Sequence, residues 1–457
     1  MKTNLCTAEL TRTSALRALG IATVVLALTG TGAVQAKEAD DCEVGIYQLP
    51  DGSHIDVGAS DDNRLRWRRN DGTTGALARD EDGIWTSTLG WTERADGIQV
   101  TFDCRKDAIT FAGVDGQRIA LDVTDVVFDG AGVQLAGRLV MPEGDARVPI
   151  AVLVHGSEHS SALDSYSLQR QFPAEGIGVF VYDKRGTGAS TGTYTQNYLL
   201  LANDAIAAVH EARRLAGDRA GKIGYQAGSQ GGWVAPLAAK IEPVDFLIVG
   251  FGLAVSPLDE DRQAIEQDLT SRGYGPEVVA KAIDVADATA AIIVNGFRDG
   301  YDQLAKVRAK YGDEPWFEHV RGNISFYLLD TPEATAREEG PAILSGVPAH
   351  YNPMPVLRNL DTPQLWILAE NDSEAPSGET QRRLRGLAAQ GKPITVAVFP
   401  DTDHGIYEYE TTGVGKRVFT RNPDGYLAMM LDYIHNGYLD DRRYGASTIF
   451  YPMTALK

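Results

Sequence analysis

Hydrophobic and polar residues alternate with a period of two in the first part of the chain. Between residues 43 and 123, short runs such as GIWTSTLGW and GIQVTFDC are separated by Asp-Gly pairs. This alternation indicates strands with one buried face, and Asp-Gly favours the tight turns of β-hairpins. We therefore predict a small all-β accessory domain over residues 37–124. Its three tryptophans are expected in the hydrophobic core rather than in a ligand cleft: Trp67, Trp85 and Trp91.

Continuous apolar runs replace this alternation after residue 125. The runs are PIAVLVHG, VFVYDKRG, KIGYQAG, FLIVGFG, QLWILA and ITVAVFP, and helical patterns separate several of them, notably over residues 198–215 and 232–241. Apolar strands that alternate with helices are typical of a mostly parallel sheet covered on both faces. We therefore predict an α/β domain over residues 125–457.

The segment from about residue 254 to 360 contains amphipathic helical patterns and no strand pattern. Examples are DEDRQAIEQDLTSRG and PEVVAKAIDVADATAAIIVNGF. We interpret this segment as a helical cap inserted over the carboxyl edge of the sheet, where folds of this kind bind ligands.

The N-terminal segment has the features of an export signal. Basic residues precede an apolar run over residues 18–28, and Val34-Gln35-Ala36 suits a signal peptidase. We predict a signal peptide over residues 1–36 and, after its removal, a periplasmic or secreted protein. The alternative is an uncleaved anchor, but about eleven apolar residues are fewer than the roughly twenty that span a bilayer. No membrane span is expected in the mature chain.

Export also bears on the cysteines. Cys6 lies within the predicted signal, so the mature chain keeps Cys42 and Cys104. An even pair in an exported protein most simply forms a disulfide, and the alternative is two free buried thiols.

The chain is acidic, with a net charge of −19 at pH 7, and loss of the predicted signal makes it more negative. Such a surface repels phosphate backbones, so we expect no nucleic-acid partner. Because the sequence has neither a His-Glu-x-x-His motif nor a cysteine–histidine cluster, we expect no bound metal.

The stretch GYQAGSQGGW places Ser229 among small residues. It follows a strand pattern and precedes the helical pattern GWVAPLAAK, and small neighbours permit a turn too tight for ordinary side chains. A strand, a sharp turn and a helix in succession form the context of an exposed nucleophile. The alternative is a glycine-rich turn around a serine without a chemical role.

A serine hydroxyl needs a base to take its proton, and the base needs a carboxylate that fixes its tautomer. Asp372 follows the strand pattern QLWILA, and His404 follows VAVFP. We predict a catalytic triad of Ser229, Asp372 and His404, with Glu370 and Glu374 as competing acids.

The oxyanion of a tetrahedral intermediate needs backbone N–H donors aimed at it. We expect one donor from Gln230, the residue after the nucleophile. The second is expected in the loop LVHGSE, with Ser157 as the first candidate and Glu158 as the next, while His155 suits a supporting role.

These motifs, in this order, resemble the bacterial α/β-hydrolases related to serine aminopeptidases and dienelactone hydrolase. The residues that carry the resemblance are GSQGGW, HGS, YDKRGTGASTG, AEND and DHG, within about Val126 to Leu439. The resemblance implies an α/β-hydrolase sheet with a cap and hydrolysis of small or medium acyl esters without a cofactor. It also implies structural roles for Asp183 and Arg185. The sequence departs from the family at Ala227, which replaces the usual first glycine, and at Glu158-His159.

The leading hypothesis is therefore an exported serine hydrolase that cleaves carboxylic esters through an acyl-enzyme. The second is a serine peptidase of the aminopeptidase or dipeptidyl-peptidase kind, in which Glu158, Asp164 or an acid of the insert binds a free amino terminus. The third is a binding protein on an inactive hydrolase fold, with the all-β domain as its working part. The expected partners are a small acyl ester or a short peptide.

Overall fold

The computed structural model describes residues 42–60, 64–413 and 415–453 of the 457-residue chain. The predicted signal peptide, residues 1–36, lies outside the described residues. Within the described part, no helix combines the length and the apolar character needed to cross a membrane.

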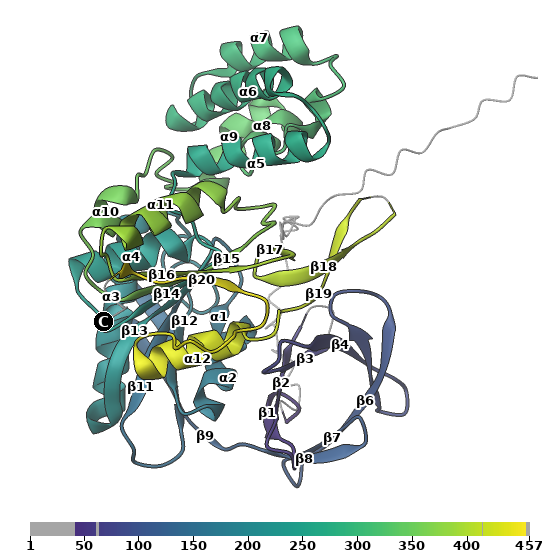
Figure 1. Ribbon diagram of the computed structural model, residues 1–457, viewed down its shortest axis with the longest axis vertical. Helices are drawn as coiled ribbons and strands as arrows, with labels where there is room; N and C mark the ends of the chain where they lie inside the picture. The colour runs from purple at the N-terminus through teal and green to yellow at the C-terminus, as the bar shows by residue number, and fades with distance from the viewer. Residues whose placement is uncertain (1–41, 61–63, 414, 454–457) are drawn as a thin grey trace, which may run out of the picture. The chain divides into compact units, whose positions relative to one another are not determined.

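The all-β region is a closed barrel of eight antiparallel strands, β1 to β8, each paired with its sequence neighbours, with β1 also paired to β8 (Figure 1). Gly52, Gly72 and Gly83 of the Asp-Gly turns have positive φ angles, which glycine adopts without strain. Cys42 and Cys104 form the predicted disulfide. The strands are β1 (Gly45–Gln48), β2 (His54–Ala59), β3 (Leu65–Arg69), β4 (Thr74–Arg79), β5 (Trp85–Leu89), β6 (Ala95–Asp103), β7 (Ala108–Phe111) and β8 (Val114–Arg118).

Trp67 and Trp85 lie in the barrel core, as expected. Trp91 differs, because it is only half-buried and its ring packs against Tyr407 and Phe419, far along the chain. The alternating pattern identifies a buried strand face but does not reveal that a barrel loop packs against another domain.

The second sheet has nine strands in the order β20-β16-β15-β14-β13-β11-β12-β10-β9, of which β11 to β16 are parallel to one another. Two hydrophobic clusters lie on its two faces, one with α3, α4, α10 and α11, the other with α1, α2 and α12. The strands are β9 (Leu121–Asp129), β10 (Gln134–Pro142), β11 (Val148–Val154), β12 (Gly178–Tyr182), β13 (Ala220–Gly228), β14 (Leu247–Gly250), β15 (Gln364–Ala369), β16 (Ile394–Phe399) and β20 (Thr448–Phe450). The helices are α1 (Ala162–Ser165), α2 (Leu168–Ala174), α3 (Tyr198–Ala216), α4 (Gly231–Ile241), α10 (Met354–Arg358), α11 (Gly378–Ala389) and α12 (Tyr426–Asn436).

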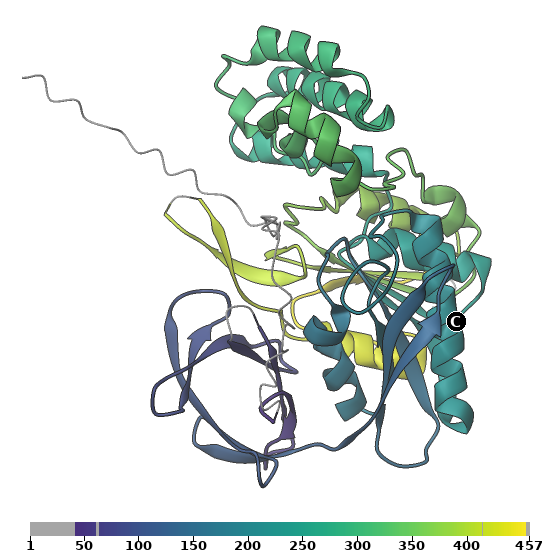
Figure 2. The same cartoon turned by 180° about the vertical axis from the view of Figure 1, so that it is seen from behind.

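Between β14 and α10, five α-helices form a group with two hydrophobic clusters of its own. Figure 2 shows this group from behind, above the end of the sheet. The helices are α5 (Pro257–Ser271), α6 (Pro276–Val294), α7 (Tyr301–Tyr311), α8 (Ser325–Asp330) and α9 (Glu333–Ile343).

A third, three-stranded sheet follows β16 and was not expected from the sequence. Its strands are β17 (Thr402–Asp403), β18 (Tyr407–Thr411) and β19 (Arg417–Arg421), in that order. Since β17 immediately precedes His404, this small sheet holds part of the candidate site.

Candidate active site

Ser229 lies in the turn between β13, which ends at Gly228, and α4, which begins at Gly231. Its φ angle is +50°, a left-handed conformation that is uncommon for a residue with a side chain. The Ser229 N–H donates to the Gly250 carbonyl at 3.1 Å, so a hydrogen bond to β14 holds this conformation. The residue stands where the strained turn of a nucleophile would be.

The glycines around Ser229 are required by close approach. A Cβ on Gly231 would lie 2.8 Å from the Val154 carbonyl oxygen. Ala227, which departs from the family pattern, is fully buried, and its Cβ would be 3.1 Å from a Cβ at position 231. The turn therefore accommodates alanine at 227 because residue 231 is glycine.

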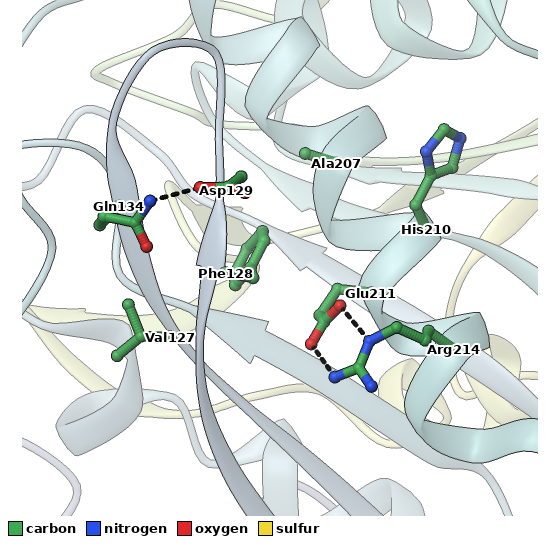
Figure 3. Close-up of a pocket in the computed structure, with 8 residues that line it drawn as sticks. All are labelled: Val127, Phe128, Asp129, Gln134, Ala207, His210, Glu211 and Arg214. Carbon is green, nitrogen blue, oxygen red and sulfur yellow. Dashed lines mark hydrogen bonds and ion pairs between the residues drawn. The ribbon is translucent and has the colours of Figure 1, made fainter.

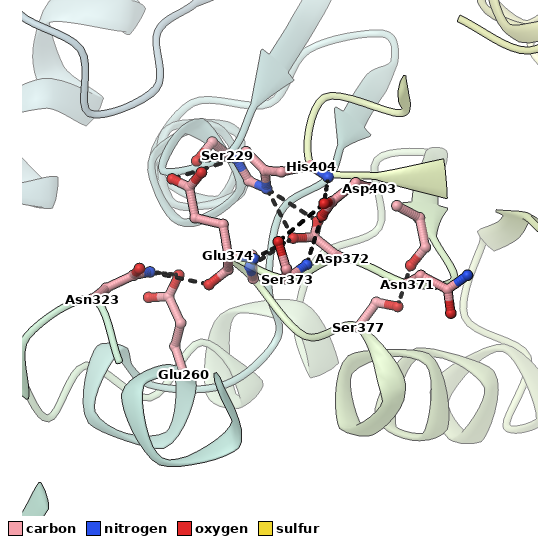
Figure 4. A network of polar contacts seen from close by, with 12 residues as sticks. Ser229, Glu260, Asn323, Asn371, Asp372, Ser373, Glu374, Ser377, Asp403 and His404 are labelled. Carbon is pink, nitrogen blue, oxygen red and sulfur yellow. Dashed lines mark hydrogen bonds and ion pairs between the residues drawn. The ribbon is translucent and has the colours of Figure 1, made fainter. Parts of the chain in front are cut away.

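The side chains of Ser229, His404 and Asp372 come together in a row (Figure 4). Ser229 Oγ is 3.2 Å from His404 Nε2, and His404 Nδ1 is 3.0 Å from Asp372 Oδ2. Asp372 is almost fully buried, and its Oδ1 accepts the backbone N–H of Ala375 at 2.7 Å. An imidazole between a hydroxyl and a carboxylate can accept the hydroxyl proton while the carboxylate stabilises the imidazolium.

Neither of the two competing acids contacts His404 Nδ1. Glu370 is exposed and accepts the N–H of Asp401. Glu374 is also exposed, but its Oε1 lies 3.9 Å from His404 Nε2, the nitrogen that faces Ser229. Only Asp372 faces Nδ1, the position that fixes the imidazole tautomer.

Several charges act on His404. Burial disfavours the charged imidazolium, but the carboxylates of Asp372, Glu374 and Glu260 outweigh it and raise the pKa of His404 to about 10. The ring also packs edge-on against Phe251, with centroids 4.9 Å apart. The site therefore favours the protonated imidazole when no substrate is bound.

The loop after β11 runs beside Ser229. A Cβ on Gly156 would lie 3.4 Å from the Ser229 Cβ, so the two backbones approach closely. Ser157 is exposed, and its carbonyl accepts from the Tyr194 hydroxyl at 2.6 Å. Gln230 is buried at the start of α4, where backbone N–H groups point out of the helix. In the described part of the chain, neither the Ser157 nor the Gln230 N–H has a hydrogen-bond partner.

A cluster of polar side chains, His155, Glu158 and Lys184, supports this loop. His155 contacts the Tyr182 carbonyl, and Lys184 Nζ donates to the Gly156 carbonyl at 2.8 Å. Glu158 is held by His155 and Tyr166; burial opposes its ionisation, but His155, Lys184 and Tyr166 lower its pKa to about 2. Glu158 therefore already has partners within the fold.

The motif of Asp183 and Arg185 connects neighbouring segments. Asp183 accepts from the Ser161 hydroxyl at 2.8 Å and the Ala189 N–H at 3.0 Å. Arg185 forms a buried ion pair with Asp204 at 2.7 Å. Neither contacts Ser229 or His404.

Sequence reasoning missed the residues that the insert contributes. Gln267 of α5 donates to the Asp372 carbonyl at 2.7 Å. Asn323 donates to Glu260 at 3.0 Å and to the Glu374 carbonyl at 3.1 Å. Glu260 and Glu374 are close enough that burial and the second carboxylate raise the pKa of Glu260 to about 8. The spacing of Glu260 and Gln267 places both on one face of the helix. This spacing is the only feature of the sequence that could have indicated their shared place at the site.

A separate groove of about 410 Å³ lies between the β9–β10 hairpin and α3 (Figure 3). It shares no residue with the Ser229 site. Across the described residues, no group of three or more His, Cys, Asp or Glu could hold a metal ion.

A family model for the alpha/beta hydrolase family matches residues 151–412, and the chain therefore belongs to that family. No curated protein matches the chain. Similar solved structures include an esterase from Pyrococcus furiosus (15% identity, TM-score 0.40, 62% of this chain and 83% of that chain). A thermophilic esterase from Thermogutta terrifontis is also similar (19% identity, TM-score 0.35, 62% of this chain and 91% of that chain). So is a proline iminopeptidase from Mycobacterium smegmatis (17% identity, TM-score 0.41, 68% of this chain and 98% of that chain).

Proposed function

We propose that the protein is a serine hydrolase that cleaves carboxylic esters through an acyl-enzyme. The observation that carries the proposal is the row Ser229 Oγ, His404 and Asp372, with contacts of 3.2 and 3.0 Å, at a strained turn beside the Gly156 loop.

In the first half of the reaction, Ser229 Oγ attacks the substrate carbonyl carbon while its proton passes to His404 Nε2. Asp372 holds the imidazole orientation and stabilises its positive charge. The N–H groups of Gln230 and Ser157 bind the oxyanion. The tetrahedral intermediate then expels the alcohol, which takes the proton from His404.

In the second half, a water molecule gives a proton to His404 and adds to the acyl carbon of Ser229. The second tetrahedral intermediate collapses, the proton returns to Ser229 Oγ, and the carboxylic acid leaves.

The test compares the purified protein with Ser229→Ala on p-nitrophenyl esters of different acyl length. We expect ester turnover that disappears in Ser229→Ala while the variant keeps its fold by circular dichroism. Equal turnover by a folded Ser229→Ala protein would contradict the proposal. Failure of a fluorophosphonate to label Ser229 in the folded protein would favour a binding protein instead.

One observation favours an aminopeptidase as the second candidate. Glu374 lies on the Ser229 side of His404, with Glu260 close to it, and this carboxylate pair could bind a free ammonium group. By contrast Glu158 already has partners, and Asp164 is exposed on α1. The test is turnover of aminoacyl anilides: if they are cleaved faster than esters, and Glu260→Gln raises KM for anilides only, the peptidase is the better description.

We also propose export, with residues 1–36 as a removable signal before an all-β domain at 37–124 and a catalytic domain at 125–457 with its cap at about 254–360. Sequencing the amino terminus of the protein from periplasm and medium tests this. A chain beginning at Lys37 would support it, and a chain that keeps residues 1–36 in the cytoplasm would contradict it.

A further inference from the structure

Asp403 is an almost fully buried carboxylate that the proposed mechanism does not use. It lies directly before His404, and its Oδ1 accepts the His404 N–H at 2.8 Å and the Ser373 N–H at 2.7 Å. Its Oδ2 accepts the Ser373 hydroxyl at 3.0 Å. Asp403 therefore connects the segment that carries His404 to the segment that carries Asp372.

Arg417, on β19, also connects the segment that carries His404 to the segment that carries Asp372. Its Nη1 donates to Asp403 Oδ2 at 2.8 Å and to the Asn371 carbonyl at 2.6 Å. In the described part of the chain it is the only cation within ion-pair distance of Asp403. Its guanidinium also lies over the Tyr409 ring, 4.2 Å from the centroid, which fixes its place on the β18–β19 hairpin.

The β18–β19 hairpin is in turn held by the barrel. The Trp91 ring lies 4.6 Å from that of Tyr407, and the Trp91 N–H donates to the Phe419 carbonyl at 2.9 Å. A second backbone bond joins the Asn422 N–H to the Gly72 carbonyl at 3.0 Å. The barrel therefore contacts the hairpin through two of its turns.

We infer that Arg417 and Asp403 are positioning residues that hold Asp372 and His404 in register, and that the barrel braces the hairpin that carries Arg417. This inference rests on the proposed function. Three segments distant in sequence meet at one carboxylate, so the His404–Asp372 contact depends on their mutual placement. A displacement of about 1 Å in a catalytic group can cost about 100-fold in rate.

The main experiment measures kcat and KM on a p-nitrophenyl ester for Arg417→Gln, Arg417→Lys and the control Lys416→Gln, the exposed neighbour on the same hairpin. We expect Arg417→Gln to lower kcat by about 100-fold with KM nearly unchanged. Arg417→Lys should recover part of the loss, because one ammonium can donate to both Asp403 and the Asn371 carbonyl. Lys416→Gln should match the unmodified protein.

Asp403→Asn keeps the shape of the carboxylate and serves if Arg417→Gln does not fold. It should lower kcat in the same way, and combining it with Arg417→Gln should cost less than the sum of the two effects, since both disturb one connection. A folded Arg417→Gln or Asp403→Asn protein with kcat within twofold of the unmodified protein overturns the inference.

A proton NMR measurement separates this inference from the proposed function. A low-field resonance from the His404 Nδ1–H that bonds Asp372 reports the contact without any turnover. We expect it to be lost or shifted in Arg417→Gln and kept in Ser229→Ala. If Ser229→Ala retains turnover but Arg417→Gln disturbs the resonance, the proposed function fails and the positioning role stands; an undisturbed resonance overturns the positioning role.

The barrel's part is tested by Trp91→Ala in the full chain. We expect a smaller loss of kcat, about 10-fold, with KM unchanged, because the backbone bond from residue 91 remains. A folded Trp91→Ala protein with unchanged kcat and an unchanged His404 resonance overturns the bracing role.

Discussion

The turn that carries Ser229 and the loop that carries His404 are built in different ways. The turn is local: β13, two residues and α4 create it, and nearby glycines permit the close approach of Val154 and Gly252. The His404 loop is contacted by Ser373 and Arg417 through Asp403. The hairpin that carries Arg417 contacts the barrel, and Gln267 of α5 contacts Asp372. The proposed nucleophile is thus encoded in one short stretch, whereas the proposed base is placed by contacts from several distant segments.

The largest expected effect comes from Asp372, the carboxylate that contacts His404. Asp372→Asn keeps the size of the side chain but no longer fixes the imidazole tautomer, so kcat on an ester should fall about 10⁴-fold. The matched control is Glu370→Gln, an exposed acid nearby in the sequence whose carboxylate accepts the Asp401 N–H. If Glu370→Gln were the damaging variant, the assignment of the acid would be wrong.

The construction of the Ser229 turn is tested by Gly231→Ala. The new Cβ would lie 2.8 Å from the Val154 carbonyl oxygen, and we expect a loss of about 1–3 kcal/mol in the free energy of unfolding. Ala227→Gly should not rescue it, because the clash with Val154 remains. The control is Gly386→Ala in α11, where a Cβ meets no atom and helix propensity favours alanine by about 0.5–1 kcal/mol. Equal effects of the two substitutions on urea unfolding would contradict this reading of the turn.

The surroundings of His404 are tested by the dependence of kcat/KM on pH. Because carboxylates raise the pKa of His404 to about 10, the active neutral imidazole forms only as pH rises towards that value, and kcat/KM should rise with it. Glu374→Gln removes one of these carboxylates, so the pKa of His404 should fall and the midpoint of the pH profile should move to lower pH.

Glu370→Gln again serves as the control, with an expected midpoint like that of the unmodified protein. A Glu374→Gln profile that moves to higher pH, or does not move, would show that Glu374 does not act on the imidazole.

The sequence predicts the turn that carries Ser229 well, but it predicts much less of the loop that carries His404. The apolar runs and the GYQAGSQGGW stretch predict the sheet and the turn, because their patterns reflect contacts between close neighbours. Trp91, Arg417 and Gln267 contact residues far away in the chain. Many other tryptophans, arginines and glutamines look the same in the sequence, so their roles depend on tertiary placement. The β17–β19 sheet escaped prediction because β17 has only two residues and β18 and β19 are only partly buried, so none of them shows a clear strand pattern.

The proposed mechanism requires that Ser229 form a covalent acyl intermediate. Rapid quenching of the protein during turnover of a p-nitrophenyl ester, followed by peptide mass spectrometry, would detect it. We expect one acyl group on the peptide that contains Ser229, and none on that peptide in Ser229→Ala. Rapid ester turnover with the acyl group on another residue, and full activity in Ser229→Ala, would contradict it.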